Sequence, residues 1–255
     1  MHSPTHLFFD VHIGRQKPES IINRETACPF CDKENLHDIL AQDGPILLIK
    51  NKFPVLADAL MTVLIETDTC EGELSIYPKE HLYRLFRFGI AKWLEMEQSG
   101  DYSSVLFFKN YGPLSGGSIY HPHMQIIGLH NMNYQERIFD EHFVGLPIAD
   151  RSGVTLNLST MPKVGFFEFN VVMNEAGNLP AFADYIQIVV HYLLNHFNRR
   201  LTSYNLFFYH IKGKIAAKIM PRFPTSPIFI GYSIPQVSNR LQDVADDIKR
   251  IYLGA

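Results

Sequence analysis

Runs of apolar, β-branched and aromatic residues recur along the whole chain, separated by short polar segments. Short runs of this kind, bounded by turn-forming residues, predict β-strands. The predicted strands are Ile46–Lys50, Thr62–Ile65, Leu74–Tyr77, Val105–Lys109, Met124–Leu129, Phe166–Met173, Leu206–Lys212 and Lys214–Ile219. Gly213 separates the last two strands, which predicts a tight hairpin turn at that point.

Apolar residues at a spacing of three or four predict helices elsewhere. The predicted helices are Leu82–Leu94, Phe182–Phe197 and Val237–Tyr252. The first of them is expected to end at Ser99-Gly100. In both halves strands cluster and a helix follows, which favours an α+β fold with a largely antiparallel sheet. The segment Gly145–Gly153 (GLPIADRSG) is interpreted as a connector, so the predicted halves are residues 1–148 and 149–255.

Composition narrows the classes of protein to consider. The chain has 255 residues, of which 46% are hydrophobic and 19% charged, as in ordinary globular proteins. Its net charge of −3 argues against a nucleic-acid binder, which usually has a basic face. No apolar run reaches the roughly 18 residues of a membrane span, and the N-terminus lacks the features of a signal peptide. The three cysteines fit a reducing compartment, so the cytoplasm is the expected location.

The segment Phe108–Leu129 carries the most informative pattern in the chain. It begins with a loop of small residues, Gly112–Ser118 (GPLSGGS), whose backbone N–H groups could hold phosphate oxygens. The sequence His121-Pro-His123-Met-Gln125 follows. Because alternate side chains of an extended strand share a face, the two imidazoles and the amide are predicted to point the same way.

This arrangement suits phosphoryl chemistry. A histidine can attack phosphorus and hold a nucleotidyl group as a phosphoramidate, which divides one displacement into two steps. Gln125 and the loop N–H groups could stabilise the charge that develops on the phosphoryl oxygens. Two histidines at this spacing could also share one metal ion.

A second motif is Cys28-Pro-Phe-Cys31, which supplies half of a tetrahedral zinc site. The alternative is a redox motif, which requires an apolar strand directly before the first cysteine. The preceding residues, 23–26, are polar (NRET), so zinc is favoured. His81 and His121 are the candidate partners, whereas Cys70 is interpreted as an ordinary buried or loop cysteine.

Taken together, these motifs resemble the galactose-1-phosphate uridylyltransferase branch of the histidine-triad superfamily. The matching pieces follow the family's order over about residues 10 to 130, and a late segment, 228–232 (IFIGY), is also similar. These pieces are Cys28–Cys31, Asn51–Pro54, His81 after Pro78, and Asn110–Gln125. The resemblance implies a HIT-like fold of two degenerate halves and a homodimer with the active site near the subunit interface.

The resemblance also implies a role for each matching residue. It implies His123 as the nucleophile and Gln125 as the contact to the transferred phosphate. The implied ligands of one structural zinc are Cys28, Cys31, His81 and His121, and the implied nucleotide-binding residues are Asn51, Phe53, Asn110, Ser115, Gly117, Ser118, Arg15 and Lys17.

Two departures from the family pattern limit the prediction. The His-x-His of a second metal site is replaced by Ala216-Ala-Lys218, with His210 as a remnant, so a single metal is predicted. Lys218 could supply a cation in place of that metal or bind a sugar phosphate. Met124 replaces the usual glycine after the nucleophile, which leaves the acceptor open.

The predicted function is therefore transfer of a nucleoside monophosphate from a nucleotide-sugar or dinucleotide to a phosphate-bearing acceptor. A nucleotide hydrolase or phosphorylase is one alternative, and a zinc-stabilised nucleotide-binding module without turnover is another. The base, the sugar, the acceptor and the pathway stay open.

Overall fold

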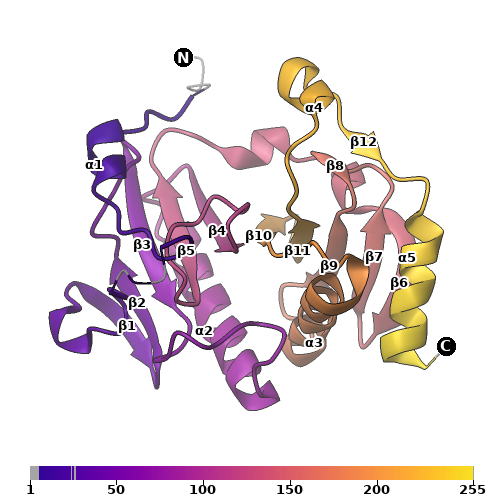
Figure 1. Cartoon of the computed structure of the whole chain (residues 1–255), viewed down its shortest axis with the longest axis horizontal. Coiled ribbons are helices and arrows are strands. Elements are labelled where there is room, and N and C mark those ends of the chain that lie inside the picture. The colour runs from indigo at the N-terminus through magenta and orange to yellow at the C-terminus, as the bar shows by residue number, and fades with distance from the viewer. Residues whose placement is uncertain (1–5, 24, 26, 255) are drawn as a thin grey trace. The chain divides into compact units, whose positions relative to one another are not determined.

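The computed structural model describes residues 6–23, 25 and 27–254 (Figure 1). The chain divides into two compact units. The first comprises Met1–Glu73 and Glu80–Arg137, and the second comprises Leu74–Lys79 and Ile138–Ala255. Among the described residues, no helix has the length and apolar character needed to cross a membrane.

The first unit contains an antiparallel sheet with the strand order β1-β2-β3-β5-β4. Its strands are β1 (Ile39–Asp43), β2 (Ile46–Lys50), β3 (Ala59–Ile65), β4 (Ser104–Tyr111) and β5 (His123–Leu129). The helix α2 (Lys79–Gln98) connects β3 to β4, and its apolar face is buried. Gly89 of α2 allows a close approach, because a Cβ atom there would lie 2.9 Å from the Phe107 ring. Shorter helices are α1 (Val11–Arg15), η1 (Lys33–Asn35) and η2 (Tyr134–Arg137).

The second unit repeats this topology. Its antiparallel sheet has the order β6-β7-β9-β11-β10, so the fifth long strand again lies between the third and the fourth. Its long strands are β6 (Gly145–Arg151), β7 (Val154–Ser159), β9 (Phe169–Asn174), β10 (Tyr204–Ile211) and β11 (Lys214–Pro221). The helix α3 (Leu179–Tyr192) connects β9 to β10 as α2 connects β3 to β4. The predicted α+β fold of two similar halves with antiparallel sheets is confirmed.

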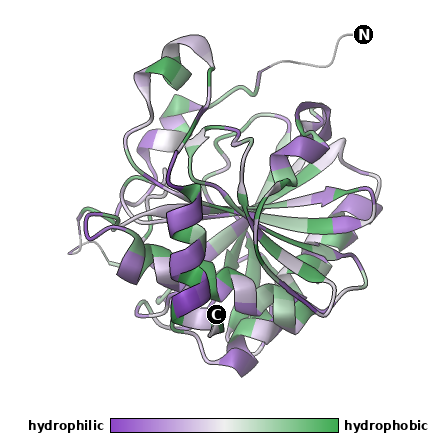
Figure 2. Cartoon of the chain, turned by 90° about the vertical axis from the view of Figure 1, so that its right-hand side faces the viewer, coloured by the Kyte–Doolittle hydropathy of each residue, from purple (hydrophilic) through white to green (hydrophobic). Residues whose placement is uncertain are grey.

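Further elements complete the second unit. The short strands β8 (Gly165–Phe166) and β12 (Gln236–Val237) form a parallel pair. The remaining helices are η3 (Asp140–Phe143), η4 (Leu193–Phe197), α4 (Pro227–Tyr232), α5 (Leu241–Ile248) and η5 (Lys249–Leu253). Figure 2 shows hydrophobic residues along the strands, whereas the outward face of the C-terminal helix is largely hydrophilic. This agrees with the burial of Val244, Ala245 and Ile248 on the opposite face of α5.

Some predicted elements were wrong. Leu74–Tyr77 contains a turn and no strand, because the Gln187 amide donates hydrogen bonds to the Leu74 and Tyr77 carbonyls, each at 2.9 Å. The segment Gly145–Gly153 is not a connector, since it contains β6 and the turn that leads to β7. The predicted division after residue 148 thus falls inside a strand, and the two compact units divide after Arg137.

Other boundaries also shifted. The run Phe166–Met173 is divided between β8 and β9. The last helix begins at Leu241, because Val237 belongs to the β12 strand.

Candidate active site and metal centre

His123 is the first residue of β5, and only 8% of its surface is exposed. Its Nδ1 lies 2.7 Å from the His121 carbonyl oxygen. Because a carbonyl only accepts hydrogen bonds, Nδ1 carries the proton and the lone pair of the neutral ring is on Nε2. Burial, assisted by the positive charge of Lys109 and opposed by the hydrogen bond to the His121 carbonyl, lowers the pKa of His123 to about 4. The imidazole is therefore neutral at pH 7.

A cavity of about 430 Å³ opens beside this histidine. It is lined by residues from β2, β3 and β5, by the Gly112–Ser118 loop and by the segments around Lys17 and Phe30. The predicted site residues that line it are Lys17, Asn51, Phe53, Gly117, Ser118, His123 and Gln125. His123 and Gln125 lie two residues apart on β5 and face the same cavity, as the alternation of a strand requires.

Local hydrogen bonds shape the walls of this cavity. The Ser115 hydroxyl donates to the Gly112 carbonyl at 2.7 Å and accepts from the Gly117 N–H at 3.3 Å. Gly112 and Gly116 have φ angles of 82° and 88°, a region that favours glycine. Ser20 holds the far end of the loop, because its N–H donates to the Ser118 carbonyl at 2.8 Å.

Cationic and aromatic side chains also line the cavity. Lys17 lines it, and burial lowers the pKa of this lysine. Phe53 follows β2, where its N–H donates to the Asn51 side-chain oxygen at 2.9 Å. The Phe30 ring packs edge-on against His123 with ring centroids 5.5 Å apart. A base, a sugar and phosphate groups could each find a matching surface here.

Three other predicted residues do not line the cavity. Ser115 is buried and holds the loop, as described above. Asn110 lies directly behind the loop, because its Cβ would be 3.3 Å from a Cβ on Gly117. Arg15 is the last residue of α1.

A cluster of side chains that could bind a metal lies next to His123. The thiols of Cys28, Cys31 and Cys70 and the Nδ1 atom of His121 all lie within 4.8 Å of one another. His121 Nδ1 is 3.4 Å from the sulfur atoms of Cys28 and Cys70, and 3.5 Å from that of Cys31. Three thiols and an imidazole in this arrangement form a complete tetrahedral donor set for zinc.

The protonation chemistry of the cluster fits a metal. His121 Nε2 lies 2.9 Å from the Thr67 carbonyl, so Nε2 carries the proton and Nδ1 is free to coordinate. Burial raises the pKa values of Cys31 and Cys70. For Cys28, burial opposes ionisation, yet contacts with His121, Cys70 and the backbone of Phe30 and Cys31 lower the pKa to about 6. The site therefore stabilises a thiolate.

The membership of this cluster corrects the sequence analysis. Cys70, interpreted above as an ordinary cysteine, is the fourth member, and His81 is not among the four grouped side chains. His81 lies in the first turn of α2. The useful signal was the position of Cys70 after β3. Because the end of β3 pairs with the start of β5, at Ile65 and His123, the loop after β3 lies beside His121.

Sequence reasoning also missed a buried ion pair close to the backbone of His123. The ammonium of Lys109, on β4, donates to the Glu66 carboxylate, and the two side chains are 1% and 0% exposed. Lys109 Nζ also lies 3.4 Å from the His123 carbonyl oxygen. The pair therefore connects β4, the end of β3 and the start of β5, where His123 lies.

In the second unit, Lys218 forms a comparable buried pair. Its ammonium lies 2.9 Å from the Glu168 carboxylate, and both side chains are fully buried. It also donates to the His142 carbonyl at 2.7 Å, and burial lowers its pKa. Lys218 thus supplies a buried cation to a carboxylate. His210 Nε2 lies 3.2 Å from the Glu175 carboxylate.

Comparison with known proteins places the chain in a family. Residues 9–132 match the N-terminal domain, and residues 135–253 the C-terminal domain, of a domain of unknown function, DUF4931. The chain belongs to the DUF4931 family. A solved DUF4931 family protein from Bacillus cereus is 44% identical, with a TM-score of 0.77 over 84% of this chain and 98% of that one.

More distant structures share the fold. An ADP-glucose phosphorylase from Arabidopsis thaliana, with bound ADP-glucose, is 14% identical, with a TM-score of 0.71 over 93% of this chain and 91% of that one. A uridylyltransferase is 15% identical, with a TM-score of 0.69 over 89% and 91%. These similarities confirm the fold that the resemblance to the galactose-1-phosphate uridylyltransferase branch implies.

One curated relative matches a part of the chain. A di-/tripeptide transporter from Lactobacillus helveticus is 29% identical over 98 residues, which are 38% of this chain. The match spans 20% of that protein's length.

Proposed function

We propose that this chain is a nucleotidyltransferase that moves a nucleoside monophosphate through a covalent intermediate on His123. The observation that carries the proposal is the fixed tautomer of His123 at the wall of a cavity with cationic, aromatic and amide groups. The fold shared with a uridylyltransferase and an ADP-glucose phosphorylase supports chemistry on nucleotides.

In the first step, Nε2 of His123 attacks the α-phosphorus of a nucleotide-sugar or dinucleotide. A phosphorus–nitrogen bond forms, and the bond from phosphorus to the bridging oxygen breaks. The sugar 1-phosphate or the remaining nucleotide leaves with that electron pair. In the second step, a phosphate oxygen of the acceptor attacks the same phosphorus and releases the neutral imidazole. A hexose 1-phosphate or inorganic phosphate would serve as the acceptor.

The residues of the cavity divide this work. Lys17 and the loop at Gly117 and Ser118 stabilise the phosphate charge, and the Gln125 amide donates to the oxygens of the transferred group. Asn51 and Phe53 hold the base and ribose. Hydrogen bonding of Nδ1 to a backbone carbonyl keeps the His123 ring oriented through both steps.

We further propose that the cluster of three cysteines and His121 holds one zinc ion. The bound ion would have a structural role, joining the Cys28–Cys31 segment and the loop after β3 to the segment that precedes β5. His121 then fixes the backbone carbonyl that orients His123. The catalytic histidine and the metal ligand are thus separate residues with coupled positions.

A turnover assay tests the proposed reaction. Purified protein is incubated with UDP-glucose, ADP-glucose or a dinucleoside polyphosphate, each with galactose 1-phosphate, inorganic phosphate or no acceptor. We expect a new nucleotide product only when a phosphate-bearing acceptor is present. His123→Ala should lose the activity by a factor of about 1,000 or more, whereas His130→Ala, outside the cavity, should retain it.

The other outcomes are equally informative. Release of free nucleoside monophosphate at the same rate with and without an acceptor would make the protein a hydrolase. Nucleotide binding without any product would make it a binding module. Either result would contradict the proposed transfer.

A further inference from the structure

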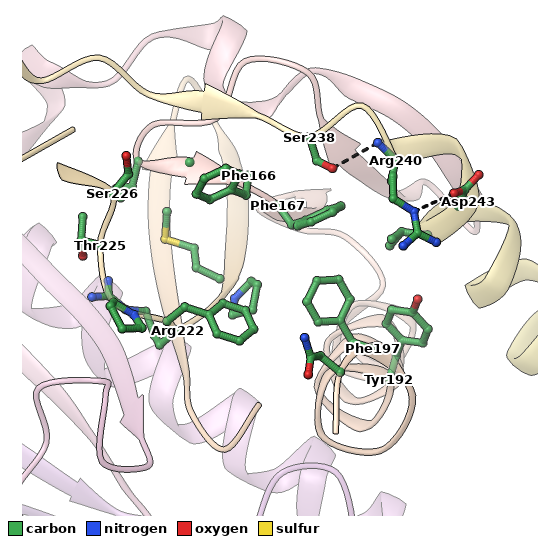
Figure 3. Close-up of a pocket in the computed structure, with 18 of the residues that line it drawn as sticks. Phe166, Phe167, Tyr192, Phe197, Arg222, Thr225, Ser226, Ser238, Arg240 and Asp243 are labelled. Carbon is green, nitrogen blue, oxygen red and sulfur yellow. Dashed lines mark hydrogen bonds and ion pairs between the residues drawn. The ribbon is translucent and has the colours of Figure 1, made fainter. Parts of the chain in front are cut away.

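The second unit contains a cavity of its own, of about 350 Å³, which is drawn in Figure 3. Its walls come from the segment around β8, the end of α3 with η4, the chain after β11 and the start of α5. All of these residues belong to the second unit, and none takes part in the chemistry proposed for His123. The volume is within the range of pockets that hold small molecules.

One side of this cavity is aromatic. The Phe167 ring packs edge-on against Phe197 with ring centroids 5.0 Å apart, and Tyr192 packs against the same ring at 6.0 Å. Phe166 lies beside them and is 46% exposed (Figure 3). Its φ of 56° is rare for a bulky residue. A group of exposed and half-buried rings offers stacking and edge contacts to a planar molecule.

The charged side chains around the cavity differ in whether they form an ion pair. Arg240 is paired with Asp243 at 2.9 Å, and Asp247 is paired with Arg250 at 2.8 Å. The backbone N–H of Arg222 donates to the Ser203 carbonyl at 2.8 Å. Its guanidinium has no ion pair or hydrogen bond to the described residues, so one positive charge on the cavity wall is not neutralised.

This cation has suitable neighbours for an anion. Figure 3 shows Arg222, Thr225 and Ser226 together at one side of the cavity, with Phe197 and Tyr192 at the other. The Ser226 hydroxyl already donates to the Gln236 side-chain oxygen. The Arg222 guanidinium, with Thr225 beside it, is therefore the group that binds carboxylate, phosphate or sulfonate oxygens through charge-assisted hydrogen bonds. The cavity therefore has an anion-binding end and an aromatic end.

We propose that this cavity is a second ligand site, which binds a small planar aromatic molecule that carries one anionic group. The ring of the ligand packs against Phe166, Phe167 and Phe197, and its anionic group pairs with Arg222. The site extends the proposed function, because it gives the second unit a binding role of its own.

Calorimetric titration with three small probes tests this site. The probes are 2-naphthoate, its neutral counterpart 2-naphthalenemethanol, and cyclohexanecarboxylate, which has the charge without the aromatic ring. We expect one-to-one binding of 2-naphthoate, and binding roughly ten- to a hundredfold weaker for each of the other two. Arg222→Gln and Phe167→Leu should each weaken 2-naphthoate binding by roughly tenfold or more.

Two controls separate this result from others. Arg200→Gln removes an exposed arginine of the same unit and should leave the affinity unchanged. Arg222→Gln should still form the nucleotide product, since Arg222 is not part of the His123 cavity. If 2-naphthoate fails to bind at millimolar concentration, or binds Arg222→Gln as tightly as the unmodified protein, the proposed site does not exist. Either outcome leaves the nucleotidyltransferase proposal untouched.

Discussion

The ion pair of Lys109 and Glu66 gives a direct test of what stabilises the strand that carries His123. Both side chains are buried, with 1% and 0% of their surfaces exposed. Lys109→Met keeps a long unbranched side chain, one atom shorter, and removes the charge, so the Glu66 carboxylate stays buried without its cation. Removal of one partner of a buried pair costs roughly 3–5 kcal/mol. At about 2–4 °C per kcal/mol for a protein of this size, the unfolding midpoint should fall by about 10 °C.

The chain offers a convenient probe for this experiment. Its one tryptophan, Trp93, is fully buried on α2 in the same unit, where its indole N–H donates to the Val105 carbonyl at 2.9 Å. Trp93 fluorescence during urea or thermal unfolding therefore reports on the first unit.

Matched variants complete the test. Lys92→Met breaks an exposed pair, with side chains 27% and 61% exposed, and should cost less than about 1 kcal/mol. The double variant Lys109→Met with Glu66→Leu should recover most of the lost stability, because no uncompensated charge stays buried. If Lys109→Met unfolds within about 1 kcal/mol of the unmodified protein, the reasoning about this pair is wrong.

Three further predictions concern the metal, the second unit and assembly. Protein purified without added metal should contain about one zinc per chain by elemental analysis. Cys70→Ser should lose the zinc together with stability, whereas His81→Ala should keep it. Zinc loss in His81→Ala alone would restore His81, in place of Cys70, as the fourth ligand. Gln187→Leu should lower the free energy of unfolding by about 2–4 kcal/mol, because the Leu74 and Tyr77 carbonyls lose their donor. Gln242→Leu on the exposed surface should change the free energy of unfolding by less than about 0.5 kcal/mol. Equal effects of the two variants would refute the tethering role of Gln187. Sedimentation velocity at micromolar concentration should show a homodimer, and a monomer would contradict the assembly that the resemblance implies.

The sequence predicted the placement of the polar side chains of β5 because that placement is local. Alternation along an extended strand brings His123 and Gln125 to the same cavity without any knowledge of the rest of the fold. Cys28 and Cys31 were recognisable for the same reason, since their spacing is itself the signal.

What the sequence did not predict depends on contacts between distant segments. Cys70 joins the metal cluster through the pairing of β3 with β5, and its sequence neighbours give no hint of this. The burial of Lys109 and Glu66 is invisible in a pattern that treats charged residues as exposed. Likewise, Leu74–Tyr77 has the composition of a strand, yet a glutamine far along the chain satisfies its carbonyls and holds it in a turn.

The central claim, that His123 carries the nucleotidyl group, is tested most directly by intact-protein mass spectrometry. The protein is incubated in parallel with UDP-glucose, ADP-glucose and a dinucleoside polyphosphate, without an acceptor, and its mass is measured at once. The account predicts a gain of one nucleotidyl group with at least one donor, and no gain in His123→Ala. An adduct that persists in His123→Ala, or no adduct with any donor, would contradict it.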